Sequence, residues 1–434
     1  MTDGIDQSKK IFHTLLVLCA LMALFSFARP AGAAETLTLD ECLVIAEAYH
    51  PSMASATASV SADRGRLTQA VVGDRFTISG KASTGRSGSD GKDESSSFSA
   101  GATASLKIFD SNKSKYSIEA QENTLFATEE SAEQTRRDVR ANVKSAYTGL
   151  LLYYETLNQR AESVRAFERH LEQATGFYEA GSKPWYDVTK AQVDLGNARL
   201  ALVEAQSNID VGKAELQNAM GVIIEEDFEL APTKWDVTPE MERDAVEFAM
   251  ENRADFLAAA YKVEASRATI GAEARASSPS ISLSGGYDGS GSHVANLDKG
   301  WNVGLNMSIP IVDGGETKAR VETARANLAS QEATYEKLRQ DIILDVRKVL
   351  SDLKKARERI ALSEVTLANA EENRRLAEGR YETGVGDALE VTDALVSLTE
   401  AQLTKYQAHN DLLTAVIDLE KAVGVELALP GEAD

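Results

Sequence analysis

The sequence has 434 residues, with 46 Lys and Arg against 67 Asp and Glu, and a formal net charge of −21. This acidic excess disfavours nucleic acid as a partner, because phosphate binding needs a basic face. The sequence also contains no nucleophile paired with a base and no glycine-rich phosphate loop, so it does not predict an enzyme.

Residues 1–34 differ in composition from the rest of the chain. Two lysines precede an apolar run over residues 11–27, and small residues such as Ala31 and Ala33 offer a cleavage site. This layout predicts a secretory signal peptide. A transmembrane anchor is the alternative, although the apolar run is at the short limit for a membrane span.

Cysteine and histidine usage predicts neither a disulfide nor a metal site. After the predicted signal peptide, Cys42 is the one cysteine, and it falls in the helical pattern "LDECLVIAEAY" as a small apolar residue. The histidines that follow it are scattered, without the spacing of metal ligands: His50, His170, His293 and His409. No cofactor is therefore expected.

Long helices dominate the predicted secondary structure. Five proline-free segments are rich in Ala, Glu, Lys, Arg, Gln and Leu, which favour helix. They cover residues 112–179, 187–221, 240–276, 315–380 and 388–424. At ~1.5 Å per residue, the fourth would be about 100 Å long. Such helices must bury a stripe against other long helices.

Four further segments alternate apolar residues with small or polar ones, which predicts strands. They are residues 75–83, 97–108, 280–288 and 301–311. Loops rich in Gly, Ser and Asp, at 84–95 and 285–299, join them as two hairpins. Strands of this length cover the apolar band of an outer membrane when tilted. A soluble sheet packed on a core fits the alternation equally well, but the export signal and the long helices favour the membrane.

Four strands cannot close a barrel, and an open sheet edge in lipid would leave backbone groups without hydrogen bonds. Other copies of the chain must therefore complete the barrel. Two, three or four copies all satisfy this physical requirement.

Most of these features occur twice, 203 positions apart. Tyr178 matches Tyr381, and Gly181 matches Gly384. Longer matches are "KIFD" at 107–110 with "PIVD" at 310–313, "DVT" at 187–189 with "EVT" at 390–392, and "AMGV" at 219–222 with "AVGV" at 422–425. Such repetition indicates quasi-symmetric architecture. We expect two structural repeats, residues 35–232 and 233–434, each reading helix, two strands, long helix, break and helix.

A row of small residues recurs every seven positions in the last helix of each repeat. In the second repeat it is Ala394, Ala401, Ala408, Ala415 and Ala422, and in the first it is Ala191, Ala198, Ala205, Gly212 and Ala219. A sustained seven-residue period predicts coiled-coil packing with closely approaching backbones. The alternative is that alanine is simply abundant in these helices.

Three segments in this order resemble the TolC family of outer-membrane efflux and secretion proteins. They are "LTLDECLVIAEAYHPSM" at 37–53, "SIPIVDGGETKARVETARANL" at 308–328 and "YETGVGDALEVTDALVSLTEAQL" at 381–403. The resemblance covers the whole chain after residue 34. It implies a membrane α/β-barrel: a homotrimer with a 12-stranded barrel in the outer membrane and an α-helical periplasmic tunnel.

The implied function is a passive exit duct for efflux or type I secretion. Its implied partners are a periplasmic adaptor (membrane fusion) protein and an inner-membrane pump or ABC transporter. A structural coiled-coil tether within the envelope is the alternative, and the four strands discriminate against it because a tether needs no lipid-facing barrel.

The resemblance also assigns roles at the two breaks between long helices, which would be the periplasmic tips. Glu390 and Asp393 match acids that narrow the closed aperture, and Asp187 and Lys190 are their equivalents in the first tip. Lys190 is the nearest candidate counter-charge. The alternative for the acids is a solvated helix start, where carboxylates suit the helix dipole.

Gly181 and Gly384 match the tip glycines that meet the adaptor. Their triplets here are "AGS" and "TGV", whereas a Val-Gly-Leu type is common in the family. The identity of the adaptor is therefore open.

Overall fold

The computed structural model describes residues 35–73, 76–89, 92–225, 228–231, 244–293 and 296–425. The predicted signal peptide and the predicted connection from Pro232 to Pro239 lie outside the described residues. The described residues form two compact units, one of 35–38 with 224–225 and 228–231, and one of the remaining described residues. In the first unit, β1 (Glu35–Leu37) pairs in parallel with β4 (Phe228–Leu230).

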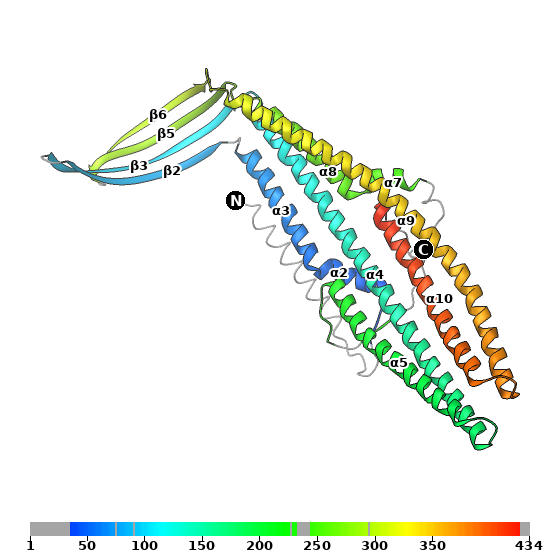
Figure 1. Ribbon diagram of the computed structural model, residues 1–434. Coiled ribbons are helices and arrows are strands. Elements are labelled where there is room, and N and C mark those ends of the chain that lie inside the picture. Colours follow the sequence, from blue (N-terminus) through cyan, green and yellow to red (C-terminus); the bar gives the residue numbers. More distant parts are fainter. Residues whose placement is uncertain are drawn as a thin grey trace, which may run out of the picture. The chain divides into compact units, whose positions relative to one another are not determined.

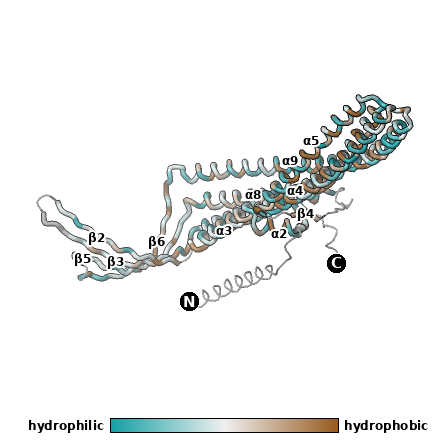
Figure 2. The backbone as a smooth tube through the Cα atoms, turned by 90° about the horizontal axis from the view of Figure 1, so that it is seen from below, coloured by the Kyte–Doolittle hydropathy of each residue, from teal (hydrophilic) through white to brown (hydrophobic). Residues whose placement is uncertain are grey.

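The second unit carries the long helices and a four-stranded sheet (Figure 1). Its helices are α2 (Leu39–Tyr49), α3 (Pro51–Val72), α4 (Lys113–Glu179), α5 (Trp185–Met220), α7 (Ala245–Asn252), α8 (Ala254–Glu273), α9 (Glu316–Glu382) and α10 (Ala388–Val423). Helices α4 and α9 have 67 residues each, so the predicted long helices are confirmed. Apolar and polar positions are interspersed along them (Figure 2). Within the described residues, no helix has the length and apolar character of a membrane span.

The helix bounds reproduce the sequence repeat. Helices α4 and α9 begin and end 203 positions apart, and so do α5 and α10. One boundary was predicted wrongly: residues 240–276 were expected to form one helix, but the chain breaks at Arg253 between α7 and α8. His50 occupies the equivalent break between α2 and α3. Each break contacts a left-handed glycine, because a Cβ on Gly221 would lie 2.7 Å from the His50 Cα and one on Gly424 3.0 Å from the Arg253 Cα.

The sheet has the order β2-β3-β5-β6, with all neighbours antiparallel. Its strands are β2 (Thr77–Ser89), β3 (Lys92–Phe109), β5 (Ser280–His293) and β6 (Asn296–Ser308). The predicted loops 84–95 and 285–299 were too long, because most of their residues continue the ladders. Serine and glycine have weak strand preference in isolation, and pairing with a neighbouring strand overrides it here.

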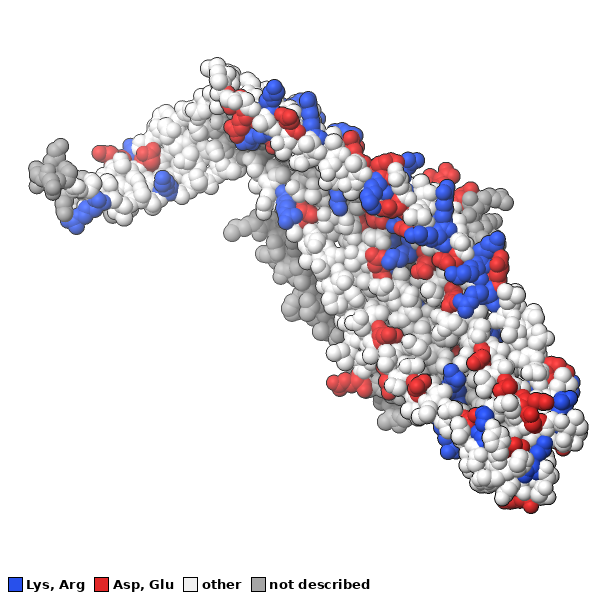
Figure 3. Space-filling model, in the orientation of Figure 1, with Lys and Arg blue, Asp and Glu red and all other residues white. Residues whose placement is uncertain are grey.

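The alternation of the strands places large apolar residues on one face of the sheet. Cross-strand neighbours on that face include Leu106 with Leu283, Leu283 with Leu305, and Tyr287 with Trp301. Trp301 is 77% exposed within this chain. On the side seen in Figure 3 the strands carry few charges, whereas the helices carry many of both signs. Strands β2 and β6 are the two edges of the sheet.

Candidate functional site

Both long-helix hairpins end in the same backbone turn. Gly181 and Gly384 have φ values of +72° and +79°. The Gly181 amide donates to the carbonyl of Tyr178 at 2.9 Å, and the Gly384 amide donates to that of Tyr381 at 3.1 Å. Glycine adopts this left-handed conformation without a Cβ penalty, which explains why it ends both helices. Both tips are thus helix–turn–helix corners with equivalent geometry.

The predicted residues of the first tip point into the protein. Asp187 is buried, and its Oδ2 accepts a hydrogen bond of 3.5 Å from the Tyr381 hydroxyl. Lys190 is half-buried, and its Nζ lies 2.5 Å from Oδ1 of Asp194. These two residues therefore form internal contacts within the chain.

The predicted acids of the second tip are exposed. Asp387 caps α10 by accepting a hydrogen bond from the Glu390 amide at 2.9 Å. The Glu390 carboxylate accepts from the Arg380 guanidinium at 2.9 and 3.3 Å. Asp393 has no ion pair within the described part of the chain. Within one chain, Lys190 therefore pairs with Asp194 and not with these acids.

Polar contacts join the two tips to each other. The Nζ of Lys183, in the first turn, donates to the carbonyl of Gly386, in the second, at 2.8 Å. The same ammonium lies 4.9 Å from the centroid of the Tyr381 ring. The Thr392 hydroxyl donates to Oδ2 of Asp194 at 3.0 Å. Helix α5 and its turn are thereby bound to α9 and α10.

Tyr381 is at the centre of these contacts and is fully buried. Its ring centroid lies 5.6 Å from that of His170 and 5.3 Å from that of Phe177. Burial, followed by the adjacent Asp187 charge, raises the pKa of Tyr381 to about 12, so the hydroxyl remains a donor. We call the group His170, Lys183, Asp187, Lys190, Asp194, Tyr381 and Thr392 the tip cluster.

Sequence reasoning assigned no site role to five members of the tip cluster: His170, Lys183, Asp194, Tyr381 and Thr392. One signal was available, because Asp194 follows Lys190 by four positions and such residues are neighbours on a helix. The other contacts join residues about two hundred positions apart. No local pattern in the sequence predicts these long-range contacts.

The small-residue row of α10 is buried throughout: Ala394, Ala401, Ala408, Ala415 and Ala422. Ala394 packs in a cluster that also holds Phe167 of α4 and Leu195 of α5. Ala415 and Ala422 belong to a buried cluster that also holds Ile342 and Val346 of α9. The row therefore lies inside the helical packing.

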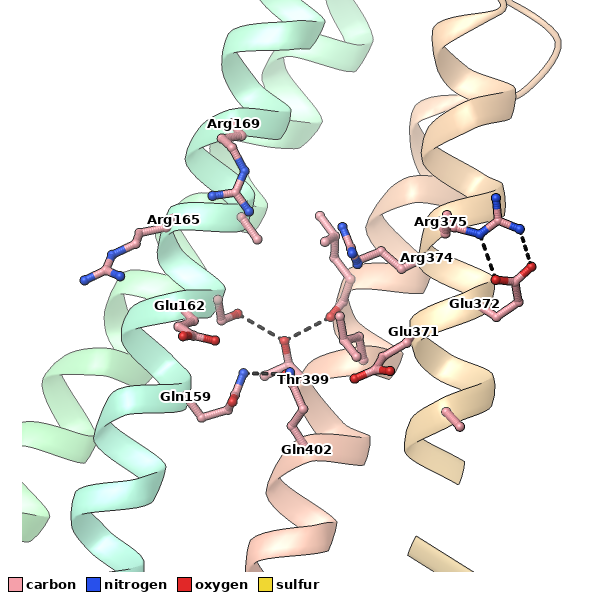
Figure 4. Close-up of a pocket in the computed structure, with 15 residues that line it drawn as sticks. Gln159, Glu162, Arg165, Arg169, Glu371, Glu372, Arg374, Arg375, Thr399 and Gln402 are labelled. Carbon is pink, nitrogen blue, oxygen red and sulfur yellow. Dashed lines mark hydrogen bonds and ion pairs between the residues drawn. The ribbon is translucent and has the colours of Figure 1, made fainter. Parts of the chain in front are cut away.

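A groove of about 650 Å³ lies between α4, α9 and α10 (Figure 4). Arg165 and Arg169 line it from α4, and Arg374 and Glu371 line it from α9. Toward α10, the Gln159 amide donates to the Gln402 side chain. The lining carries charges of both signs, so the groove offers a polar surface rather than an apolar ligand pocket.

A family model described as outer membrane efflux protein matches the chain twice, over residues 43–222 and 245–425. The chain belongs to this family. The two matches fall on the two halves of the duplication, and together they cover most of the chain. This outer membrane efflux protein, a member of the TolC family, is thus an outer-membrane protein.

Similar proteins are named as outer-membrane proteins. The chain is 27% identical over 316 residues to the outer membrane protein OprJ of Pseudomonas aeruginosa. This match covers 69% of this chain and 64% of that protein. It is 22% identical over 419 residues to the outer membrane efflux protein BepC of Brucella suis, covering 95% of this chain and 91% of that protein. The match to OprJ thus spans less than two thirds of that relative.

The crystal structure of the channel-forming protein CusC has the same fold. It superposes with a TM-score of 0.82 at 22% identity, covering 93% of this chain and 96% of that one. The predicted fold class, long helices with four strands per chain, is therefore confirmed for this outer membrane efflux protein.

Proposed function

We propose that this outer membrane efflux protein works as one of three chains of a passive exit duct. The observation that carries the proposal is the single four-stranded sheet, which has a large apolar face and two free edges. Edges in lipid must pair, and pairing of β6 with β2 of the next copy would close a barrel. Family membership favours three copies.

The test is the mass and conductance of the purified chain. Native mass measurement in detergent should give three chains, and the trimer should conduct ions in a planar bilayer. A stable water-soluble monomer would contradict the duct. A trimer that never conducts would favour the alternative of a structural envelope tether.

We propose a periplasmic adaptor and an inner-membrane pump or ABC transporter as partners, for efflux or type I secretion. The chain itself has no nucleotide-binding or redox motif, so energy for export would come from the pump. The exposed turns at Gly181 and Gly384 are the proposed adaptor contacts, one in each structural repeat (35–232 and 233–434). Cross-linking of Ser182→Cys and Val385→Cys variants to a candidate adaptor tests this, and cross-links confined to other surfaces would contradict it.

The acids of the second tip are the proposed aperture of the duct. In a trimer, Glu390 and Asp393 would place six carboxylates around one opening, which favours cations. Lys190 and Asp187 would limit their repulsion indirectly by holding the first tip in place. Glu390→Gln/Asp393→Asn should weaken cation selectivity and block by multivalent cations. Glu400→Gln, an exposed acid further along α10, is the control and should change neither.

A further inference from the structure

His170 is a buried histidine whose ring has no hydrogen bond. Its side chain belongs to α4 and is 3% exposed, and neither Nδ1 nor Nε2 has a partner in the described structure. Most buried polar side chains in proteins are hydrogen-bonded, so such an exception calls for an explanation. A neutral imidazole tolerates this position at a modest cost. A charged one, with two N–H donors, does not.

Charged groups face His170 from the neighbouring elements. Helix α5 contributes Asp187, Lys190 and Asp194, and α9 contributes Glu378. The Tyr381 ring lies near both the His170 ring and the Lys183 ammonium, and the Thr392 hydroxyl of α10 donates to Asp194. The carboxylates are already engaged: Asp187 by Tyr381, Asp194 by Lys190 and Thr392, and Glu378 by Arg374 at 2.8 Å.

We propose that His170 is an acid sensor within the tip cluster, and that uptake of a proton by its ring loosens the contacts between the two tips and opens the duct. A protonated ring must find acceptors, and two of the carboxylates facing it, Asp187 and Asp194, bind α5 to α9 and α10. It can gain Asp187 by competing with Tyr381, or Asp194 by competing with Thr392. The hydrogen bonds that this competition breaks are the ones that hold the tips together. The proposal rests on the proposed duct.

The direction of the response follows from linkage. Burial lowers the pKa of His170 below its ordinary value of 6.5, although Asp194, Asp187 and Glu378 partly offset this. A solvated histidine in the open arrangement therefore binds a proton more readily than the buried one. Above pH 6.5 the closed arrangement keeps its full stability relative to the open one. It loses this stability as the pH falls through the lowered pKa that His170 has in the closed arrangement. One such site changes the open-to-closed ratio by at most about tenfold per pH unit.

The test records single trimers of the full chain in planar bilayers between about pH 7.5 and 5.5, a window that spans the ordinary histidine pKa. The parent should open increasingly as the pH falls. His170→Phe and His170→Gln fill the site without titrating there. Both should therefore open as often as the parent at about pH 7.5, and their opening should not change as the pH falls. His409→Gln replaces an exposed histidine on α10 and should respond like the parent.

Three results would overturn the inference. They are a parent whose open fraction is independent of pH, a His170 variant that still opens on acidification, or a loss of the response in His409→Gln. If neither His170 variant assembles, hydrogen exchange of the parent decides: protection of amides 381–392, corrected for intrinsic rates, should fall on acidification, and unchanged protection refutes the proposal. A parent that conducts at no pH would overturn the proposed duct and this inference with it.

Discussion

The two tips share a backbone and differ in what their side chains do. Both turns place a left-handed glycine after a 67-residue helix, with three matching backbone hydrogen bonds. Yet Asp187 of the first tip is buried, whereas its counterpart Glu390 in the second is exposed. Tyr178 of the first tip is 44% exposed, whereas its counterpart Tyr381 is fully buried.

The asymmetry has a simple physical consequence. Lys183 donates to Gly386, which is its own counterpart in the duplication, so the first tip reaches across to the second. The first tip supplies the internal polar contacts, and the second supplies exposed carboxylates. The two turns are alike, but their side chains differ: those of the first tip hold the hairpins together, and those of the second tip are exposed and line the opening of the duct in our proposal.

The largest expected difference between the copies is at the paired tyrosines. Tyr381→Ala should remove about 3–5 kcal/mol from the free energy of unfolding, because it empties a fully buried site. The matched Tyr178→Ala should cost about 0.5–1.5 kcal/mol, mainly the ring contact with Trp185. Denaturant unfolding of both variants measures this. Equal losses would mean that the two tips are energetically equivalent.

Most of this fold could be predicted from the sequence, since the helices follow composition and proline placement, and the turns follow Gly181 and Gly384. The strand ends could not, because Ser and Gly residues such as Ser87 and Gly289 join the sheet through pairing with a neighbour. The break at Arg253 was also missed, since alanine-rich sequence continues on both sides.

The location of the candidate site could be predicted from the sequence, but the contacts between its side chains could not. The acids after each turn could be named, but Asp187 and Glu390 occupy equivalent positions and have opposite burial. Asp187 is buried where it accepts a hydrogen bond from Tyr381 of the other hairpin, whereas Glu390 pairs with Arg380 of its own hairpin and stays exposed. Asp187 and Tyr381 are distant in sequence, so local sequence patterns do not reveal their contact.

Enlarging a residue of the small-residue row should destabilise both copies by a similar amount. Ala205→Leu and Ala408→Leu should each cost about 1–3 kcal/mol, because both alanines are buried and the added atoms would overpack the helices. Thr404→Leu, at an exposed position of α10, is the control and should melt like the parent. Thermal melting compares all three variants. If either alanine variant melts at the temperature of the parent, the seven-residue row in that helix reflects only the abundance of alanine and not close packing.

The turn glycines should also respond alike, but less strongly. Gly181→Ala and Gly384→Ala each force a Cβ into a left-handed conformation, which costs about 1–2 kcal/mol. Nothing lies within 4 Å of either added Cβ, so backbone strain is the whole effect. Gly379→Ala, at a helical position that is equally open, should be neutral or slightly stabilising. Unequal losses in calorimetry would reveal a contact present in one turn alone.

The smallest effect belongs to a pair that the first tip lacks. Arg380 binds Glu390 through two hydrogen bonds, whereas the first-tip counterpart of Arg380 is Phe177. Both charges are exposed, so Arg380→Gln should barely change the melting temperature. It should still raise the cation selectivity of the trimer, because each Glu390 loses its counter-charge, and this gain should vanish in high salt. Arg375→Gln removes a similar pair with Glu372 on α9 and should leave selectivity unchanged. If Arg380→Gln and Arg375→Gln behave identically in bilayers, Glu390 does not face the conducting path.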